Sequence, residues 1–453
     1  MQPYRYHVFV CDQRKPEGVP CCAARGSAAT LEALRNEVIG RGLADVVQIT
    51  TCGSLGLCER GPNLVVYPEG VWYSGVRPED VPELVQSHFL HGWPLERLLN
   101  RDDARVRAEI HSNRAKFLAA QRARDAAGVL PDDLNQTLRG YMESRALLTA
   151  LELDLFTAVG DGATALEVAQ KIWTHPRSTE MLLNALASMG MLVKRQGIFR
   201  TTPTTARCFV EGSKDNARPG LIHTANIWHR WSNLTDCVRA GTAVGHQEMG
   251  NRGDDWTQSF IAAMHRNAAE RAPLVVKAIG PGANERLLDV GGGSAAYSIA
   301  FAQANESLHA TLLDLPTVLP IAQGHINEAG LAGRVDTRGG DLRHDPLGKD
   351  FTLILVSAIC HMLSPEENQD LLRRSLDALA HRGRVVIQDF ILESDKTSPK
   401  QAALFALNML VGTAAGSTYS YEEYAAWLRA AGFHDVREIR LPGPSSLMVG
   451  MKE

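Results

Sequence analysis

The segment that most constrains the fold is a short apolar strand that ends in a run of glycines. Residues 287–290 are apolar except for one aspartate, as is typical of a buried parallel strand. Gly291 to Gly293 follow, and a helix of small residues begins near residue 295. Glycine is needed where the backbone passes close to a ligand and leaves no room for a Cβ. The segment therefore predicts a nucleotide-binding crevice at the carboxyl end of a first strand.

Three aspartates favour S-adenosylmethionine (SAM) over a dinucleotide in this crevice. The glycine pattern alone also fits NAD. Asp289, however, precedes the glycines, where a carboxylate can hold an amino group directly or through water. Asp314 ends a second strand and can accept both ribose hydroxyls, and Asp341 follows a third strand near the adenine position. Residues 435–441 and 446–451 predict the terminal hairpin of methyltransferases. The predicted cofactor contacts are Asp289, Gly291, Gly293, Asp314, Asp341, Leu342 and Ser357.

The composition is that of an ordinary globular protein. The chain has 453 residues, 45% of them hydrophobic and 22% charged, with a net charge of −4. This length suggests about two to four domains. The charge balance favours neither nucleic acid nor an anionic membrane. No apolar run reaches the ~18 residues of a membrane span, and the N-terminus lacks the apolar core of a signal peptide. We expect a cytoplasmic protein.

The first 58 residues hold five of the eight cysteines, namely Cys11, Cys21, Cys22, Cys52 and Cys58. Strands are predicted at 7–11 and 46–50, a helix at 31–40, a hairpin over 64–73 and a closing helix at 79–90. This alternation has the size of a thioredoxin-like domain, but it lacks a Cys-x-x-Cys redox pair. Disulfides are rare in a reducing compartment, so thiols clustered in loops indicate zinc or an iron–sulfur cluster.

Four motifs of this region resemble the thioredoxin-like 2Fe–2S ferredoxins over about residues 5–100: Val8-Phe-Val-Cys11, Cys22-Ala-Ala-Arg-Gly26, Gly56-Leu-Cys-Glu-Arg-Gly-Pro62 and Tyr67-Pro-Glu-Gly-Val-Trp-Tyr73. The resemblance implies a 2Fe–2S cluster held by Cys11, Cys22, Cys52 and Cys58, with Cys21 spare. One departure is clear. The family usually spaces its last two cysteines as Cys-x3-Cys, which would put a cysteine at position 54, and this chain has Ser54 at that position. Zinc or free reduced thiols are the alternatives.

The middle of the chain predicts a linker helix followed by a winged helix. Residues 100–127 are charged and free of Gly and Pro, and 128–131 break the helix. Helical patterns then precede a small wing over 191–201. A DNA-reading helix should expose cations and amides, whereas the third helix, 178–189, is largely apolar. Burial against a second copy of the chain explains so apolar a surface better.

Residues 132–453 resemble the SAM-dependent O-methyltransferases that dimerise through a winged-helix domain, a class that includes the plant caffeic acid type. The motifs that carry this likeness are Leu153-Asp-Leu-Phe156, Leu182-Leu-Asn-Ala-Leu186, Asp289-Val-Gly-Gly-Gly293, Cys360-His361 and Ala431-Gly-Phe433. The resemblance implies an α/β multidomain homodimer with a Rossmann-like methyltransferase domain. We therefore expect a ferredoxin domain (1–100), a helical linker (101–130), a winged-helix dimerisation domain (131–215) and a SAM-binding domain (216–453).

A histidine after the predicted fourth strand is the candidate general base. His361 lies just beyond strand 351–356, beside the expected methyl group, and imidazole titrates near neutral pH. By resemblance His361 is the catalytic histidine and Asp389 a carboxylate that orients it. Thr418 and Met362 stand where the family commonly has further acidic residues. The resemblance also implies that Trp228, Trp231, Met264 and Asn267 line the acceptor pocket.

The expected activity is methyl transfer from SAM to a hydroxyl of a small aromatic or secondary metabolite. Sulfur or carbon acceptors remain open. So does a SAM-retaining enzyme that hydroxylates or decarboxylates, and so does a redox-regulated binding protein. The iron–sulfur domain would serve redox sensing, electron delivery to a redox partner protein, docking or structure.

Overall fold

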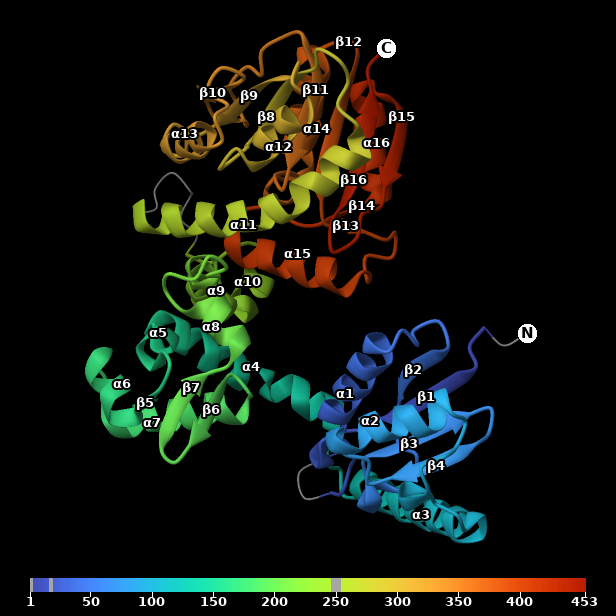
Figure 1. The fold of residues 1–453 in the computed structure, drawn as a ribbon. Helices are drawn as coiled ribbons and strands as arrows, with labels where there is room; N and C mark the ends of the chain where they lie inside the picture. Colours follow the sequence, from blue (N-terminus) through green and yellow to red (C-terminus); the bar gives the residue numbers. More distant parts are fainter. Residues whose placement is uncertain (1–2, 16–18, 246–253) are drawn as a thin grey trace. The chain divides into compact units, whose positions relative to one another are not determined.

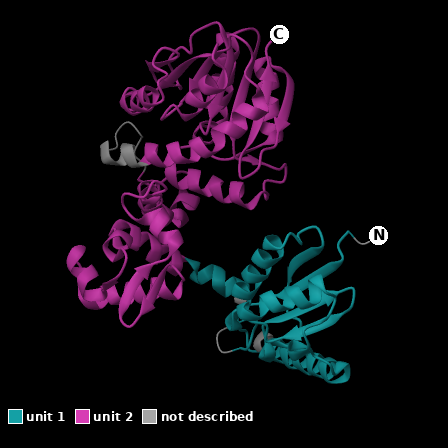
Figure 2. Cartoon of the chain, in the orientation of Figure 1, with its two compact units in different colours: residues 1–140 teal, residues 141–453 magenta. Residues whose placement is uncertain are grey.

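The computed structural model describes residues 3–15, 19–245 and 254–453. The chain divides into two compact units, residues 1–140 and 141–453 (Figure 2). Within the described residues no helix is long and apolar enough to cross a membrane.

The first unit is built on a four-stranded mixed sheet in the order β2-β1-β3-β4. Helix α1 connects β1 to β2, which run parallel, and β3 and β4 form an antiparallel hairpin beside β1. This is the βαβ–ββα order expected for a thioredoxin-sized domain. The closing helix is one α-helical turn followed by a π-helical turn. The bounds are β1 (Tyr6–Cys11), α1 (Ser27–Gly40), β2 (Val47–Cys52), β3 (Asn63–Tyr67), β4 (Val71–Ser74), α2 (Val81–Leu84) and η4 (Val85–Leu90).

The segment expected as a linker instead packs against the cysteine-bearing loop of the same unit. It forms α3 (Asp103–Ala126), whose Glu109 makes an ion pair with Arg60 at 2.5 Å. Asn113 donates from Nδ2 to the Gly56 carbonyl at 2.8 Å. Gly56 has φ +84°, and a Cβ there would lie only 3.0 Å from Ile110. Residues 101–130 therefore belong to the first unit.

Helix α4 (Asp132–Glu152) spans residues of both units and leads into a small helical region with a wing. A three-stranded sheet in the order β5-β7-β6 forms the wing, close to the predicted position. Leu151, Phe156, Leu183 and Phe199 form the core. The apolar third helix is buried on one side only, and Met181 on its other side is 61% exposed. The bounds are α5 (Leu155–Val159), β5 (Ala163–Thr164), α6 (Ala165–Lys171), α7 (Pro176–Ser188), β6 (Leu192–Arg195), β7 (Ile198–Thr201) and α8 (Pro203–Phe209).

The C-terminal domain is a seven-stranded sheet covered by helices on both faces, in the order β10-β9-β8-β11-β12-β16-β15 (Figure 1). The first five strands of that order are parallel, and β16 and β15 form the predicted antiparallel hairpin. The strand bounds are β8 (Arg286–Val290), β9 (His309–Asp314), β10 (Val335–Gly339), β11 (Phe351–Ser357), β12 (Leu379–Asp389), β15 (His434–Ile439) and β16 (Ser446–Met451).

Alternate side chains of the central strands enter two separate cores. Ile354 and Val356 of β11 pack with α14 and α16, whereas Leu353 and Leu355 pack with α11, α12 and α13. Burial on both faces explains why these strands are almost wholly apolar. The remaining bounds are α9 (Arg218–Trp231), α10 (Leu234–Ala240), α11 (Asp254–Ile279), α12 (Ala296–Ala304), α13 (Leu319–Glu328), α14 (Pro365–Ala378), β13 (Ile391–Leu392), α15 (Lys400–Gly412), β14 (Tyr419–Ser420) and α16 (Tyr421–Ala431).

Candidate active site

The glycine turn after β8 leaves an open surface above the sheet. Gly291 has φ +68°, and a Cβ there would lie 2.4 Å from Ile359, so only glycine fits. Gly293 has φ +56°, and a Cβ there would meet nothing within 4 Å among the described residues. The turn is tied to β9 because Gly293 N–H donates to Asp314 Oδ2 at 2.8 Å. A ligand can therefore approach the backbone at Gly293.

The Asp289 side chain packs against the backbone of this turn at Gly292. Its side chain is completely buried, and a Cβ on Gly292 would lie 2.8 Å from the Asp289 carboxyl carbon. Ser298 Oγ donates to Oδ2 at 2.7 Å, whereas Oδ1 is buried and has no hydrogen-bond partner among the described residues. Burial raises the pKa of Asp289 to about 6, although the Ser298 hydrogen bonds oppose the shift. The unpartnered oxygen fits a role in holding an amino group, with or without a water.

Asp314 and Asp341 lie at the ends of neighbouring strands, as predicted. Asp314 Oδ1 accepts the Leu315 N–H at 2.7 Å, and burial raises the pKa of this carboxyl group. A carboxylate offers about four acceptor sites, so Asp314 retains capacity for ribose hydroxyls. Asp341 Oδ1 accepts the Arg343 N–H at 2.9 Å. Leu342 is half-buried, and its Cδ2 would lie 3.4 Å from a Cβ on Gly291, so Leu342 lies beside the turn.

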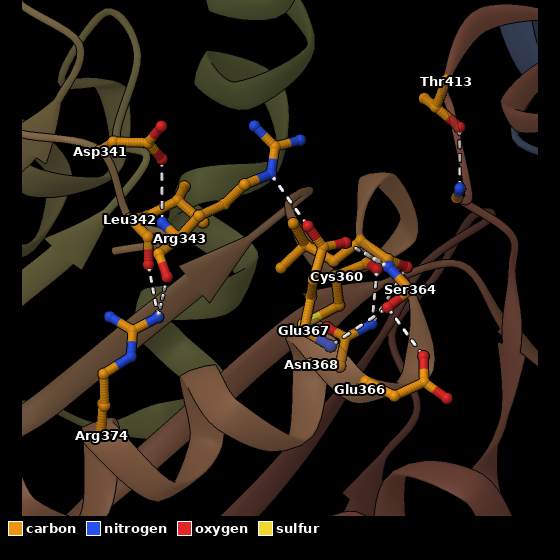
Figure 3. A network of polar contacts seen from close by, with 12 residues as sticks. Asp341, Leu342, Arg343, Cys360, Ser364, Glu366, Glu367, Asn368, Arg374 and Thr413 are labelled. Carbon is orange, nitrogen blue, oxygen red and sulfur yellow. Dashed lines mark hydrogen bonds and ion pairs between the residues drawn. The ribbon is translucent and has the colours of Figure 1, made fainter. Parts of the chain in front are cut away.

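The Asp341–Arg343 loop is anchored by an arginine that the sequence did not single out. Arg374 of α14 donates to the Leu342 carbonyl at 2.7 Å and to the Arg343 carbonyl at 3.1 Å (Figure 3). Arg343 in turn pairs with Glu367 at 3.2 Å. The Arg374 side chain therefore holds the loop that we expect beside the adenine.

His361 and Asp389 form a buried pair at the carboxyl ends of β11 and β12. Oδ1 of Asp389 lies 2.7 Å from Nδ1 of His361, whose side chain is almost fully buried. An ionised carboxylate only accepts, so Nδ1 carries the proton and the Nε2 lone pair remains for an acceptor's proton. Asp389 Oδ2 also accepts the His361 backbone N–H at 3.1 Å. The structure thus brings the two predicted catalytic residues together.

Two backbone contacts hold the short helical turn η7 (Cys360–Met362) that carries His361. Asn368 is fully buried on α14 and donates to the Cys360 carbonyl at 2.9 Å (Figure 3). Ser417 N–H donates to the His361 carbonyl at 2.9 Å. A Cβ on Gly416 would lie 2.4 Å from that carbonyl oxygen, so the 413–418 loop packs tightly against His361.

Ser357 and Thr418 turn their hydroxyls toward other groups in the protein. Ser357 Oγ donates to Gln388 Oε1 at 2.5 Å, and Tyr297 O–H donates to the same oxygen at 3.0 Å. Thr418 Oγ1 donates to the Ala402 carbonyl at 3.1 Å. Thr418 therefore contacts α15, and the carboxylate that contacts His361 is that of Asp389.

The predicted acceptor residues separate into different surroundings. Trp231 donates from Nε1 to Asn408 Oδ1 of α15 at 2.9 Å, whereas the Trp228 ring packs under Arg145 of α4, with the guanidinium 5.6 Å from its centroid. On α11, Met264 is half-buried and Asn267 is exposed. These residues thus lie on α9 and α11, and their shared role in acceptor binding stays a prediction.

Two phenylalanines outside the predicted site residues lie next to His361. The rings of Phe390 and Phe405 stack with centroids 4.2 Å apart, and Phe405 meets the His361 ring edge-on at 4.9 Å. Both are half-buried. Phe390 follows Asp389 directly, and Phe405 belongs to residues 404–410, whose apolar spacing indicates a helix with one face toward a pocket. The pair supplies a flat apolar wall beside the candidate base.

A separate cavity of about 450 Å³ lies in the winged-helix region. Its wall includes Tyr141 and Met142 of α4, Leu155 of α5 and Leu182 of α7. Tyr141 and Met142 are at least half exposed. This cavity is lined by residues 141–182 and includes none of the predicted SAM or acceptor residues.

In the first unit, Cys11 and Cys52 end β1 and β2, and Cys22 lies near Cys11 in the segment between β1 and α1. Cys11 and Cys52 are partners in the β1–β2 register. A hydrogen bond from Cys22 is the main cause that lowers the pKa of Cys11 to about 6, and this bond with burial raises the pKa of Cys22. Burial raises the pKa of Cys52 to about 11. Cys58 instead contacts Ser54 Oγ at 3.1 Å.

These thiols do not form a ready metal site. Across the described residues no group of three or more His, Cys, Asp or Glu side chains is arranged to hold a metal ion. The expected four-cysteine ligand set is therefore not assembled here: Cys58 contacts Ser54, and Cys22 Sγ accepts a hydrogen bond from the Asn63 side chain. Cys21 is buried apart, with its Sγ accepting the Ala24 N–H.

Comparison with known proteins agrees with this geometry. Residues 231–434 match the family described as O-methyltransferase domain, and residues 135–212 match the O-methyltransferase dimerisation domain. The 3-hydroxy-5-methyl-1-naphthoate 3-O-methyltransferase of Streptomyces sahachiroi is 33% identical over 337 residues, which are 71% of this chain and 95% of that protein. The tetracenomycin polyketide synthesis 8-O-methyl transferase TcmO of Streptomyces glaucescens is 29% identical over 71% of this chain and 97% of its own length.

Solved structures show the same architecture over the same share of the chain. PigF with SAH aligns with a TM-score of 0.65 at 26% identity, covering 71% of this chain and all of that one. An O-methyltransferase family protein from Burkholderia thailandensis aligns with a TM-score of 0.64 at 25% identity, covering 71% and 97%. Residues 1–134 lie outside both family matches. The glycine turn, the paired His361 and Asp389 and these matches together place the chain in the family of SAM-dependent O-methyltransferases that carry a dimerisation domain.

Proposed function

We propose that this enzyme methylates a hydroxyl group on a small planar aromatic acceptor, with His361 as general base. The observation that carries the proposal is the His361–Asp389 pair at 2.7 Å beside the stacked Phe390 and Phe405 rings. The Asp389 carboxylate fixes the imidazole so that Nε2 is free to take the acceptor's proton. A stacked aromatic wall suits a flat ring more than a flexible chain.

The residues around the glycine turn fit SAM. When bound, SAM supplies an electrophilic methyl group on its sulfonium sulfur. Asp314 would hold the ribose hydroxyls, Gly291 and Gly293 would allow close approach, and Asp341 with Leu342 would bound the adenine. Support comes from the open space above Gly293 and from the unpartnered Oδ1 of Asp289.

The transfer step asks two things of the protein. The acceptor oxygen must be aligned with the methyl carbon, and its proton must leave as the new O–CH3 bond forms and the S–CH3 bond breaks. His361 Nε2 takes that proton, and S-adenosylhomocysteine is the coproduct. Phe390 and Phe405 exclude water from the side of the imidazole that they cover.

The acceptor class is suggested by relatives whose names specify aromatic acceptors. The Streptomyces sahachiroi relative methylates a 3-hydroxyl of a naphthoate. Another, the L-tyrosine C(3)-methyltransferase of Streptomyces lavendulae, is 26% identical over 70% of this chain and methylates carbon. We favour oxygen because the Streptomyces sahachiroi relative, at 33% identity, is named as an O-methyltransferase, whereas the carbon methyltransferase is 26% identical.

The test is incubation with SAM and 3-hydroxy-1-naphthoate, with mass spectrometry of both products. The proposal expects S-adenosylhomocysteine and a methyl ether in equal amounts, and loss of both in His361→Gln. A product methylated on carbon would move the assignment to a C-methyltransferase. Acceptor conversion without S-adenosylhomocysteine would instead identify a SAM-retaining hydroxylase or decarboxylase.

A homodimer is the expected assembly, with the contact formed by about residues 130–209. The dimerisation-domain match supports this, as do the exposed apolar residues Tyr141, Met142 and Met181. Light scattering at micromolar concentration should give twice the mass of 49.4 kDa. A monomer mass would contradict the proposal.

The first unit is proposed to bind a 2Fe–2S cluster through Cys11, Cys22, Cys52 and Cys58 and to serve redox sensing, docking or exchange with a redox partner protein. The sheet order and the close approach of Cys11, Cys22 and Cys52 support it, although Cys58 would have to leave Ser54. Anaerobically purified protein should hold about two iron atoms per chain. Cys11→Ser should abolish this and Cys21→Ser should not. Absence of iron, or stoichiometric zinc, would refute the cluster.

A further inference from the structure

One face of helix α15 extends from the candidate base to helix α9. Phe405, Asn408 and Gly412 recur at spacings of three and four residues, so they share this face. Phe405 meets the His361 ring edge-on, with centroids 4.9 Å apart. Three residues further on, Asn408 Oδ1 accepts the Nε1–H of Trp231 on α9 at 2.9 Å. An acceptor that lies against Phe405 is therefore within one helical turn of Asn408.

The contact with Trp231 fixes the orientation of the Asn408 carboxamide. An indole N–H can only donate, so the atom that it meets is the carbonyl oxygen of the side chain. The amide nitrogen Nδ2, with its two N–H groups, then lies on the other side of the carboxamide. Within the described residues Nδ2 makes no hydrogen bond, and Asn408 is only half-buried. Nδ2 can therefore donate to a ligand.

The surroundings of Asn408 favour a negatively charged ligand group. The half-buried Arg230 precedes Trp231 on α9, and a Cβ on Gly412 would lie 3.5 Å from the Arg230 Nη1. Neither α9 nor α15 contains an acidic residue. A hydrogen-bond donor and a cation on two neighbouring helices without carboxylates suit an anionic oxygen, because hydrogen bonds to charged groups are the stronger ones.

We propose that Asn408 is a specificity-determining residue, which donates from Nδ2 to a carboxylate on the aromatic acceptor. The proposal rests on the proposed function, because it takes the acceptor to lie against Phe405 with its hydroxyl at His361. In this arrangement Trp231 holds the carboxamide, and the carboxamide binds the acid group of the acceptor. The acceptor class is then a hydroxylated aromatic acid, and the same ring without the acid group binds less tightly.

The test compares 3-hydroxy-1-naphthoate with 2-naphthol, which has the same hydroxyl on the same ring but lacks the carboxylate. Affinity is measured by calorimetry on the full chain with bound S-adenosylhomocysteine, so that no methyl transfer takes place. The wild type should bind the naphthoate about tenfold more tightly, as expected for one hydrogen bond to a charged group. A naphthoate affinity no higher than that of 2-naphthol would overturn the proposal.

Two substitutions separate the hydrogen bond from packing. Asn408→Leu removes the amide and should lower the naphthoate affinity about tenfold, with a much smaller effect on 2-naphthol. Asn408→Asp keeps an oxygen for the Trp231 N–H but places a negative charge near the carboxylate, so it should lower the naphthoate affinity further. An equal loss for both compounds in these variants would show that Asn408 only packs against the acceptor, and would refute the proposal.

Gln401→Leu is the matched control. Gln401 is an exposed amide in the first turn of the same helix. Its replacement should change neither affinity. If it lowers the naphthoate affinity as much as Asn408→Leu does, the preference for the acid does not come from the Asn408 amide and the proposal is wrong.

These affinities do not depend on the base, so the outcome is separate from that of the proposed function. A preference for the naphthoate that depends on Asn408, without methyl transfer in the presence of SAM, would refute the proposed reaction and support the role of Asn408. Methylation of both compounds with equal kcat/KM and equal affinity would support the reaction and refute the role of Asn408.

Discussion

Asp389 holds His361 at two points, accepting the ring Nδ1–H at 2.7 Å and the backbone N–H of the same residue at 3.1 Å. One carboxylate therefore fixes both the position of the turn and the rotation of the imidazole. Rotation about χ1 would break the first bond without breaking the second. The geometry thus favours a single orientation with Nε2 directed away from Asp389.

Replacing His361 should remove the base while leaving cofactor binding intact. His361→Gln is expected to lower kcat by ~10²–10⁴, the usual contribution of general base catalysis. Asp389→Asn should cost less, because the base remains and only its orientation and tautomer suffer. Steady-state kinetics with calorimetric SAM titration checks both. A rate within about threefold of wild type in His361→Gln would indicate an acceptor that needs no base, such as a thiolate or an activated carbon.

Asp314 should contribute strongly to SAM affinity. Asp314→Ala removes the expected ribose contacts and also the bond from Gly293 N–H that holds the turn. Charge-assisted hydrogen bonds contribute ~1.5–3 kcal/mol each, so affinity should fall at least tenfold. Asp336→Ala on neighbouring β10 is the control, because Asp336 is exposed. If calorimetry gives the two variants equal SAM affinities, the assignment of this crevice as the SAM site is wrong.

Phe405 should affect acceptor binding more than cofactor binding. Phe405→Ala removes one ring of the stacked pair and its edge contact with His361, so KM for an aromatic acceptor should rise about tenfold. SAM affinity should stay unchanged. Leu404→Ala is the matched control on the same helix, since Leu404 is 48% exposed. If both variants raise KM equally, the aromatic wall does not bind the acceptor.

Asp289 should make the SAM-free protein less stable as the pH rises. Burial raises its folded pKa from 3.8 to about 6, so the folded state binds the proton more tightly than the unfolded state. Stability therefore falls between about pH 4 and pH 6 and stays lower above, by on the order of 3 kcal/mol. Asp289→Asn should raise the thermal midpoint at pH 7 and change it little at pH 4. Calorimetric scans at the two pH values check this, and an equal shift at both would contradict it.

Features that depend on local sequence were predictable. The glycine turn, the strands around it and the terminal hairpin follow from apolar runs and turn residues a few positions apart. The His361–Asp389 pair was predicted from the family resemblance, and the structure brings the two residues together because the parallel strands β11 and β12 end at the same edge of the sheet.

Features that depend on side-chain direction were not predictable. Trp228 and Trp231 are one helical turn apart, yet one meets Arg145 of α4 and the other Asn408 of α15. The Phe390–Phe405 stack joins residues on different elements, and no periodicity links them. The cysteines were identified by spacing, but spacing does not reveal that Cys58 contacts Ser54.

The packing of α3 against the Gly56 loop changes how the N-terminal part can be excised. A fragment that stops at residue 100 would lose Glu109, Ile110 and Asn113. Arg60 would then lack its ion pair with Glu109, and the loop at Gly56 would lose its contacts with α3. A fragment of the N-terminal part that keeps these contacts should therefore end after Ala126, in the segment 127–131 between α3 and α4. A fusion of the cysteine-bearing domain to another enzyme should therefore include α3.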